Sequence, residues 1–154
     1  MSCAGQRLNG AAARILTNCI NREAMFDWKV RVYYEDTDAG GIVFYANYLK
    51  FFERARTEWL RALDIHQQQL KDTHQCMFVV KSSAVDYHAP ARLDDELRLT
   101  LMVEKLGKAS VLFRQQAWCG ERLLADGLIK VGCVGSLDVK PVAIPVVVRE
   151  KMSA

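Results

Sequence analysis

Residues Ala46–Leu63 read Ala-Asn-Tyr-Leu-Lys-Phe-Phe-Glu-Arg-Ala-Arg-Thr-Glu-Trp-Leu-Arg-Ala-Leu, and they constrain the architecture more than any other segment. Their large apolar residues recur every three or four positions, as on one face of an α-helix. That face consists of Tyr48, Phe52, Ala55, Trp59 and Leu63, and Leu49, Phe51 and Leu60 widen it. A helix that is apolar on most sides must be enclosed by other elements. We therefore expect one long, central helix over about 46–63.

The rest of the chain mostly follows the period of two that marks β-strands. The clearest example is Leu97–Val103, where apolar residues occupy every second position. Further strands are expected at 27–34, 78–88, 109–119 and 123–134, with a polar connection at 66–75 and an extended tail at 141–148. This order predicts an α+β fold in which a curved antiparallel sheet of about five strands wraps around the helix.

Length and composition place the chain among ordinary globular proteins. It has 154 residues, 51% of them hydrophobic, and a net charge of +3. We expect a single domain at 26–154, preceded by a flexible extension at 1–25. The mild charge, and the lack of a basic run with interleaved aromatics, argue against a nucleic-acid partner. No apolar run approaches the roughly 20 residues of a membrane helix, so no membrane span is expected.

The cysteines and histidines do not show the spacing of a metal or redox site. The five cysteines are scattered, and none forms a Cys-x-x-Cys pair. We interpret all five as inert thiols, which implies a reducing compartment, and we expect a cytoplasmic protein. The three histidines, His66, His74 and His88, are too far apart to show metal-ligand spacing, so no metal site is expected.

The loop Asp36-Thr-Asp-Ala-Gly-Gly41, between the first strand and the helix, concentrates the residues that can carry chemistry. Asp38 lies just ahead of Gly40 and Gly41, which let the backbone approach a ligand. The first N–H groups of the following helix have no internal partner and carry a partial positive charge, so they favour a developing oxyanion. A second interpretation makes Asp36 and Asp38 turn formers or helix caps.

One carboxylate beside an oxyanion site is sufficient to cleave a thioester. A thiolate leaves readily because thiol pKa values lie near 8.5, so no general acid is needed. The carboxylate could attack the carbonyl to form a mixed anhydride, or activate a water molecule as a general base. The sequence leaves both mechanisms open.

Other polar residues are weaker candidates. Lys108 and Ser110, at a predicted hairpin, either hold a phosphate or are merely solvated. Asn47 either caps the helix or orients Asp38. On the helix itself, Glu53 and Glu58 are expected to pair with neighbouring arginines.

Two long stretches resemble the signature of a known family. Arg31-Val-Tyr-Tyr-Glu-Asp-Thr-Asp-Ala-Gly-Gly-Ile-Val-Phe-Tyr-Ala-Asn-Tyr48 and Phe51-Phe-Glu-Arg-Ala-Arg-Thr-Glu58 closely resemble the 4-hydroxybenzoyl-CoA thioesterase family. The likeness continues through Val85-Asp-Tyr-His-Ala-Pro-Ala-Arg-Leu-Asp-Asp95 and covers about residues 26–146. The chain looks most like the YbgC branch, acyl-CoA thioesterases associated with the Tol-Pal system of Gram-negative bacteria.

The resemblance implies the hotdog fold, assembled as a homodimer or homotetramer with active sites between protomers. It also implies hydrolysis of an acyl-CoA to a free acid and CoA, without a cofactor. Asp38 would be the nucleophile or general base, and the Tyr45 N–H would be the oxyanion donor. Many YbgC members carry His at the position of Tyr45, so only a backbone role carries over there. The expected substrate-binding residues are Gly40, Gly41, Asn47, Lys108 and Ser110.

Two other functions compete with hydrolysis. A hotdog dehydratase would need a His paired with an acid, and no His lies within 36–48. A non-catalytic module that senses acyl-CoA or docks an acyl carrier protein is the other alternative. Hotdog regulators of that kind carry an N-terminal DNA-binding domain, and residues 1–24 are too short for a helix-turn-helix. The sequence does not indicate the length of the acyl chain.

Overall fold

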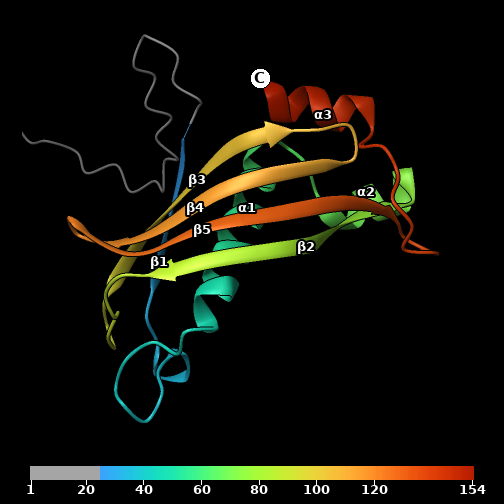
Figure 1. The fold of residues 1–154 in the computed structure, drawn as a ribbon. Helices are drawn as coiled ribbons and strands as arrows, with labels where there is room; N and C mark the ends of the chain where they lie inside the picture. Colours follow the sequence, from blue (N-terminus) through green and yellow to red (C-terminus); the bar gives the residue numbers. More distant parts are fainter. Residues whose placement is uncertain (1–24) are drawn as a thin grey trace, which may run out of the picture.

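The computed structural model describes residues 25–154, in which an antiparallel sheet curves around one long helix (Figure 1). The strands are β1 (Phe26–Arg31), β2 (Cys76–Tyr87), β3 (Glu96–Leu106), β4 (Ser110–Cys119) and β5 (Arg122–Gly135). They form one five-stranded sheet in the order β1-β3-β4-β5-β2, and every neighbouring pair is antiparallel. β1 and β2 are therefore the two edges of the sheet.

The long helix, α1 (Asn47–Ala62), lies across the concave face of this sheet (Figure 1). Phe51 and Phe52 are fully buried on it. From β3, three alternate leucines are buried in the same core: Leu97, Leu99 and Leu101. Burial of apolar surface on both partners is the main force that holds the helix in the sheet. The expected α+β hotdog architecture, with one enclosed helix, is confirmed.

One polar side chain crosses the core and joins the helix to the middle of the sheet. Gln115, on β4, is completely buried. Its Nε2 donates to the carbonyl oxygen of Phe52 at 2.9 Å, and its Oε1 accepts from Arg56 Nη1 at 2.9 Å. A buried amide must satisfy both its donor and its acceptor. Gln115 therefore also helps to fix where α1 lies on the sheet.

Three segments differ from the sequence-based expectation. The first strand ends at Arg31, and a 3-10 turn, η1 (Tyr34–Asp36), follows it. The predicted polar connection contains α2 (Gln67–His74), whose apolar period is weak because it buries only Leu70. The predicted extended tail contains α3 (Val146–Ser153). Its valine-rich start has the composition of a strand, but it follows Pro145, a residue that favours helix starts.

The charged residues of α1 also differ in part from expectation. Glu58 pairs with Arg61 at 2.6 Å, as predicted. The expected pairing of Glu53 with an arginine is wrong, because its carboxylate accepts a hydrogen bond from Thr57 Oγ1 at 2.6 Å. Arg54, the other arginine near Glu58, lies over the Phe51 ring, 5.8 Å from its centre.

The cysteines of the described region are free thiols. Cys76 and Cys133 are buried and Cys119 is partly buried. Burial, followed by the neighbouring Cys76, raises the pKa of Cys133 to about 12, so this thiol stays protonated and unreactive. Cys3, Cys19 and almost all of the predicted flexible extension lie outside the described residues. From Met25 to the C-terminus, no helix has the length and apolar character needed to cross a membrane.

Replacing Phe52 tests the enclosure of α1. The ring packs close to the strand β5, since a methyl group added at Gly127 would lie 3.1 Å from Phe52 Cε2. Phe52→Ala should lower the free energy of unfolding by about 3–5 kcal/mol because it leaves a cavity. The matched control is Tyr34→Ala, because Tyr34 is 83% exposed; it should change stability by less than about 0.5 kcal/mol. Equal effects in chemical denaturation would contradict this account.

Candidate active site

Residues 37–43 form a small hairpin-like turn between β1 and α1. Thr37 bridges to Val43, and the N–H of Asp38 donates to the carbonyl oxygen of Ile42 at 2.9 Å. At the tip, the Gly41 N–H donates to the carbonyl oxygen of Asp38 at 3.0 Å. Gly41 has a φ of 76°, a conformation that glycine adopts without strain. The turn thus presents Asp38 at an exposed, well-defined tip.

The two carboxylate oxygens of Asp38 have different surroundings. Oδ1 accepts a hydrogen bond from the Gly40 N–H at 2.8 Å. A Cβ at residue 40 would lie only 3.0 Å from this oxygen, so the close approach favours glycine there. Oδ2 makes no hydrogen bond within residues 25–154. One oxygen is therefore held by the turn while the other is open to react.

Asp36, two residues earlier, is buried and ties the turn to the helix. Its Oδ2 accepts from the Tyr33 N–H and its Oδ1 from Asn47 Nδ2, both at 2.8 Å. Its carbonyl oxygen accepts from the Phe44 N–H at 3.1 Å. Asn47 is the first residue of α1, and it contacts Asp36 rather than Asp38. Any effect of Asn47 on the orientation of Asp38 is therefore indirect.

Tyr45 lies just before the start of α1, with 64% of its surface exposed. Its N–H has no hydrogen-bond partner in the described part of the chain, so it is open to an acceptor. Its carbonyl oxygen accepts from the Tyr87 hydroxyl at 2.9 Å, and the two rings lie 6.3 Å apart. Sequence reasoning missed Tyr87, because no pattern links residues that only the curvature of the sheet brings together.

Tyr48 supports the same region from the first turn of α1. Its hydroxyl oxygen accepts from the Ala91 N–H at 3.2 Å, and its ring lies 5.5 Å from that of Tyr87. Burial raises the pKa of both Tyr48 and Tyr87 above the ordinary value, so both phenols stay neutral at physiological pH. Residues 25–154 contain no group of three or more His, Cys, Asp or Glu side chains arranged to hold a metal ion.

Lys108 and Ser110 lie at the other end of the sheet from Asp38. Arg31, which precedes the loop, is opposite Glu96, whereas Leu106 ends β3 just before the Lys108 turn. Ten residues of strand separate those ends, roughly 33 Å. Figure 1 shows the same separation between the loop before α1 and the β3–β4 turn. Within a single chain, Lys108 and Ser110 therefore lie too far from Asp38 to contact the same part of a substrate.

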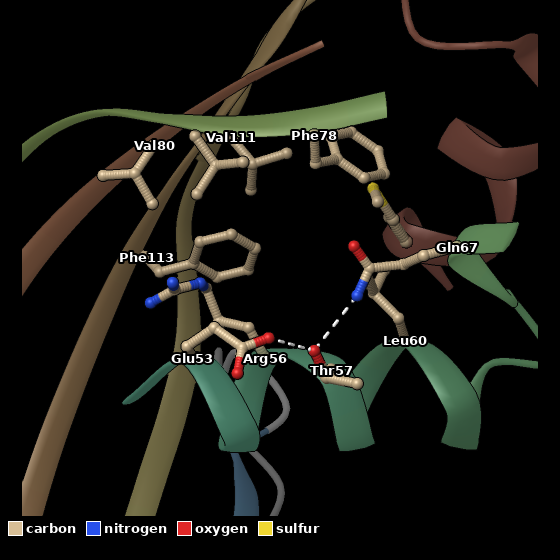
Figure 2. Close-up of a pocket in the computed structure, with 11 residues that line it drawn as sticks. Glu53, Arg56, Thr57, Leu60, Gln67, Phe78, Val80, Val111 and Phe113 are labelled. Atoms are coloured by element: carbon tan, nitrogen blue, oxygen red, sulfur yellow. Dashed lines mark hydrogen bonds between the residues drawn. The ribbon is translucent and has the colours of Figure 1, made fainter. Parts of the chain in front are cut away.

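A cavity of about 120 Å³ lies between α1 and the sheet (Figure 2). Most of its wall is apolar, but Glu53, Arg56, Thr57 and Gln67 also line it. Sequence reasoning treated the helix charges as surface pairs, because nothing in a helical period shows which polar residues face a gap. Arg56 and Gln67 are therefore additions from the tertiary structure.

Comparisons with known proteins identify the family of this chain. Residues 40–125 match the family model of the thioesterase superfamily. The acyl-CoA thioesterase YbgC of Haemophilus influenzae is 49% identical over 78% of this chain and 88% of its own length. The acyl-CoA thioester hydrolase YbgC of Escherichia coli is 46% identical over 79% of this chain and 90% of its own length.

A solved structure supports the fold as well. A "Probable Thioesterase" from Bartonella henselae superposes with a TM-score of 0.76 at 30% sequence identity, over 79% of this chain and all of that one. The residues that match the family model, 40–125, begin just after Asp38 and include α1, α2 and the strands β2, β3 and β4. The chain therefore belongs to the thioesterase superfamily of hotdog proteins, within its YbgC-like family.

Proposed function

We propose that this chain hydrolyses the thioester of an acyl-CoA to a free carboxylic acid and CoA, with Asp38 as the reacting carboxylate. One arrangement carries the proposal. Asp38 has an open Oδ2 at the tip of a turn, and Asp36 ties that turn to the start of α1. The unpaired Tyr45 N–H lies at the same helix start. Relatives named as acyl-CoA thioesterases support the choice of substrate class.

Asp38 Oδ2 has two chemical routes. As a nucleophile it bonds to the thioester carbonyl carbon, the C–S bond breaks, and CoA leaves as a thiolate; water then cleaves the mixed anhydride. As a general base it takes a proton from water, whose oxygen bonds to the same carbon before the thiolate leaves. Both routes consume one water molecule and need no general acid, because a thiolate is a good leaving group.

The carbonyl oxygen becomes negatively charged in either route. The Tyr45 N–H, at the positive end of α1, is the donor proposed to stabilise it. One such donor typically contributes about 3–4 kcal/mol to the lowering of the barrier. Because this role uses the backbone, the Tyr45 side chain is free to serve packing against Phe44 and Tyr87.

A second copy of the chain would supply the missing contacts to CoA. β2 is a long edge strand, and unpaired edges readily add another strand. Antiparallel pairing of two β2 strands about a twofold axis would set the Tyr87 end of one chain beside the Cys76 end of the other. That arrangement brings the β3–β4 turn of one protomer, with Lys108 and Ser110, to the same side as Asp38 of the other. We propose that these residues contact the CoA phosphates there.

Two expectations from the sequence stay predictions. A role beside the Tol-Pal system rests on the family resemblance alone. A cytoplasmic location is consistent with the three free thiols of the described region.

The exchange Asp38→Asn tests the catalytic carboxylate. Asparagine keeps an oxygen for the Gly40 N–H but removes the charge and the nucleophile. Thiol release from acyl-CoAs, acetyl to palmitoyl, should fall at least a hundredfold while acyl-CoA binding persists. Glu35→Gln, an exposed acid of the same segment, should retain activity. Binding without turnover by the native protein would instead favour a module that binds acyl-CoA or an acyl carrier protein.

A double-mutant cycle tests the tie between the turn and the helix. Asn47→Ala leaves the buried Asp36 Oδ1 without a donor, which should lower the free energy of unfolding by about 1–3 kcal/mol. The double variant Asp36→Ala/Asn47→Ala should lose less free energy of unfolding than the sum of the two single variants, because both single changes remove the same hydrogen bond. Strict additivity in urea denaturation would show that the contact is not energetically coupled.

Hydrogen exchange tests the proposed pairing of two chains. Raising the protein concentration should slow exchange of β2 amides, whose edge would become hydrogen-bonded in the dimer. β1 is the internal control, since it is the other edge and should not respond. Equal behaviour of both edges, or a monomeric mass in sedimentation at micromolar concentration, would contradict pairing through β2.

A further inference from the structure

A groove runs along α1 between the helix and β2. Its outer part is a hollow of about 510 Å³, with Leu49, Val80 and Ile129 among its walls. Its inner part is the cavity of about 120 Å³ shown in Figure 2. Glu53, Arg56 and Val80 line both parts, so the two hollows adjoin each other at these side chains.

The groove begins near the start of α1, the end of the helix that Asp36 ties to the turn. Asn47, which Asp36 holds at the start of α1, precedes Leu49 by only two residues. Arg56 follows Asn47 by nine residues, or about 13–14 Å along the helix axis. An acyl group with its thioester near the start of α1 would need a chain of medium length to extend this far along the helix and reach Arg56.

The walls suit a hydrocarbon chain. The inner part is lined by apolar side chains from the helix and from three strands, namely Leu60, Phe78, Val80, Val111, Phe113 and Val131. Figure 2 shows Phe78, Val80, Val111 and Phe113 facing the helix across the gap. Apolar clefts with a few placed polar groups are the usual form of a small-molecule site.

Arg56 is the exceptional residue in these walls. Nη1 donates to Gln115 Oε1 at 2.9 Å, and the other guanidinium N–H groups have no hydrogen-bond partner among residues 25–154. Burial lowers its pKa, yet an arginine remains charged at physiological pH. Arg56 is partly buried, and it forms no salt bridge within the same residues, so its open N–H groups are available to an anion in the groove.

Glu53 is near enough to favour the charged form of Arg56, and so to oppose the lowering of its pKa, but the two side chains form no salt bridge. Glu53 lines the groove, but it is exposed and its carboxylate accepts from Thr57, whose hydroxyl in turn accepts from Gln67 Nε2 at 3.0 Å (Figure 2). The wall also contains the cations Lys50 and Arg54. Three cations against one carboxylate favour an anionic occupant.

We propose that the groove takes an acyl chain that is apolar along its length and ends in a carboxylate, which binds the open N–H groups of Arg56. The fork of a guanidinium matches a carboxylate with parallel hydrogen bonds. This inference rests on the proposed hydrolase function and specifies its substrate class: the CoA monothioester of a medium-chain dicarboxylic acid. An acyl chain that ends in a methyl group would give Arg56 neither a hydrogen-bond acceptor nor a negative charge. A chain that ends in a hydroxyl group would give it an acceptor but no negative charge.

The test compares two substrates that differ only at the far end, decanoyl-CoA and the CoA monothioester of decanedioic acid. Wild-type protein should favour the second by about ten- to a hundredfold in kcat/KM, the usual effect of a hydrogen bond to a charged group. Arg56→Met should abolish that preference and hydrolyse decanoyl-CoA at least as well. Arg56→Lys, which keeps the charge and a donor for Gln115, should retain part of it.

Arg61→Met is the matched control, because Arg61 lies on the same helix, pairs with Glu58 and lines neither part of the groove. It should leave both substrates unaffected. The comparison of the two substrates with wild-type protein needs no variant, so it still tests the inference if Arg56→Met does not fold.

The outcomes separate this inference from the proposed function. Hydrolysis of both substrates at equal efficiency by wild-type protein would overturn the inference and leave the hydrolase function intact. If Arg56→Met lowers kcat/KM equally for both substrates, Arg56 contacts the CoA part of the substrate or stabilises the fold. That result would also overturn the inference. If neither substrate is turned over, the panel from acetyl- to palmitoyl-CoA decides the hydrolase function. Calorimetry then decides this inference, and equal binding of the two acyl-CoAs would overturn it.

Discussion

Enclosure of α1 is the constraint on which the rest of this structure depends. The helix carries large apolar side chains on most of its circumference, so no flat layer could cover it. The sheet meets this requirement by curving, and β3, β4 and β5 present alternate apolar residues to the helix. Because α1 is held across the concave face, its start is fixed at one end of the sheet, where the loop from β1 arrives.

The two aspartates of that loop have separate tasks because they face different surroundings. Asp36 is buried and has a donor on each carboxylate oxygen, which makes it part of the framework. Asp38, two residues on, stands at the exposed tip with one oxygen held and the other open. The framework residue and the proposed reacting group are thus close in sequence, and the hydrogen bonds of Asp36 help to set the position of Asp38.

The same helix serves the proposed reaction at two places. Just before its start, Tyr45 offers an unpaired N–H, and its middle forms one wall of the groove that contains Arg56. The interior position of Arg56 depends on Gln115, a single amide that also binds the helix backbone at Phe52. A proposed dimer through β2 would complete the site with the remote β3–β4 turn, which one chain keeps roughly 33 Å away.

The sequence by itself determined the enclosed helix, the four long strands and the reactive turn. Each is a local pattern, either a period of 3.6 or 2 or an acid followed by two glycines. Local patterns of this kind can be recognised in the sequence without the structure. It misjudged α2 and α3, whose apolar faces are too small or too valine-rich to show a helical period. Tertiary structure alone decided that Asn47 binds Asp36, that Tyr87 reaches Tyr45, that Lys108 lies far from Asp38 and that Arg56 faces a cavity. The first three depend on the relative positions of segments that are separated in the chain, and the last depends on which face of the helix points inward. Both are set by how the sheet curves around the helix.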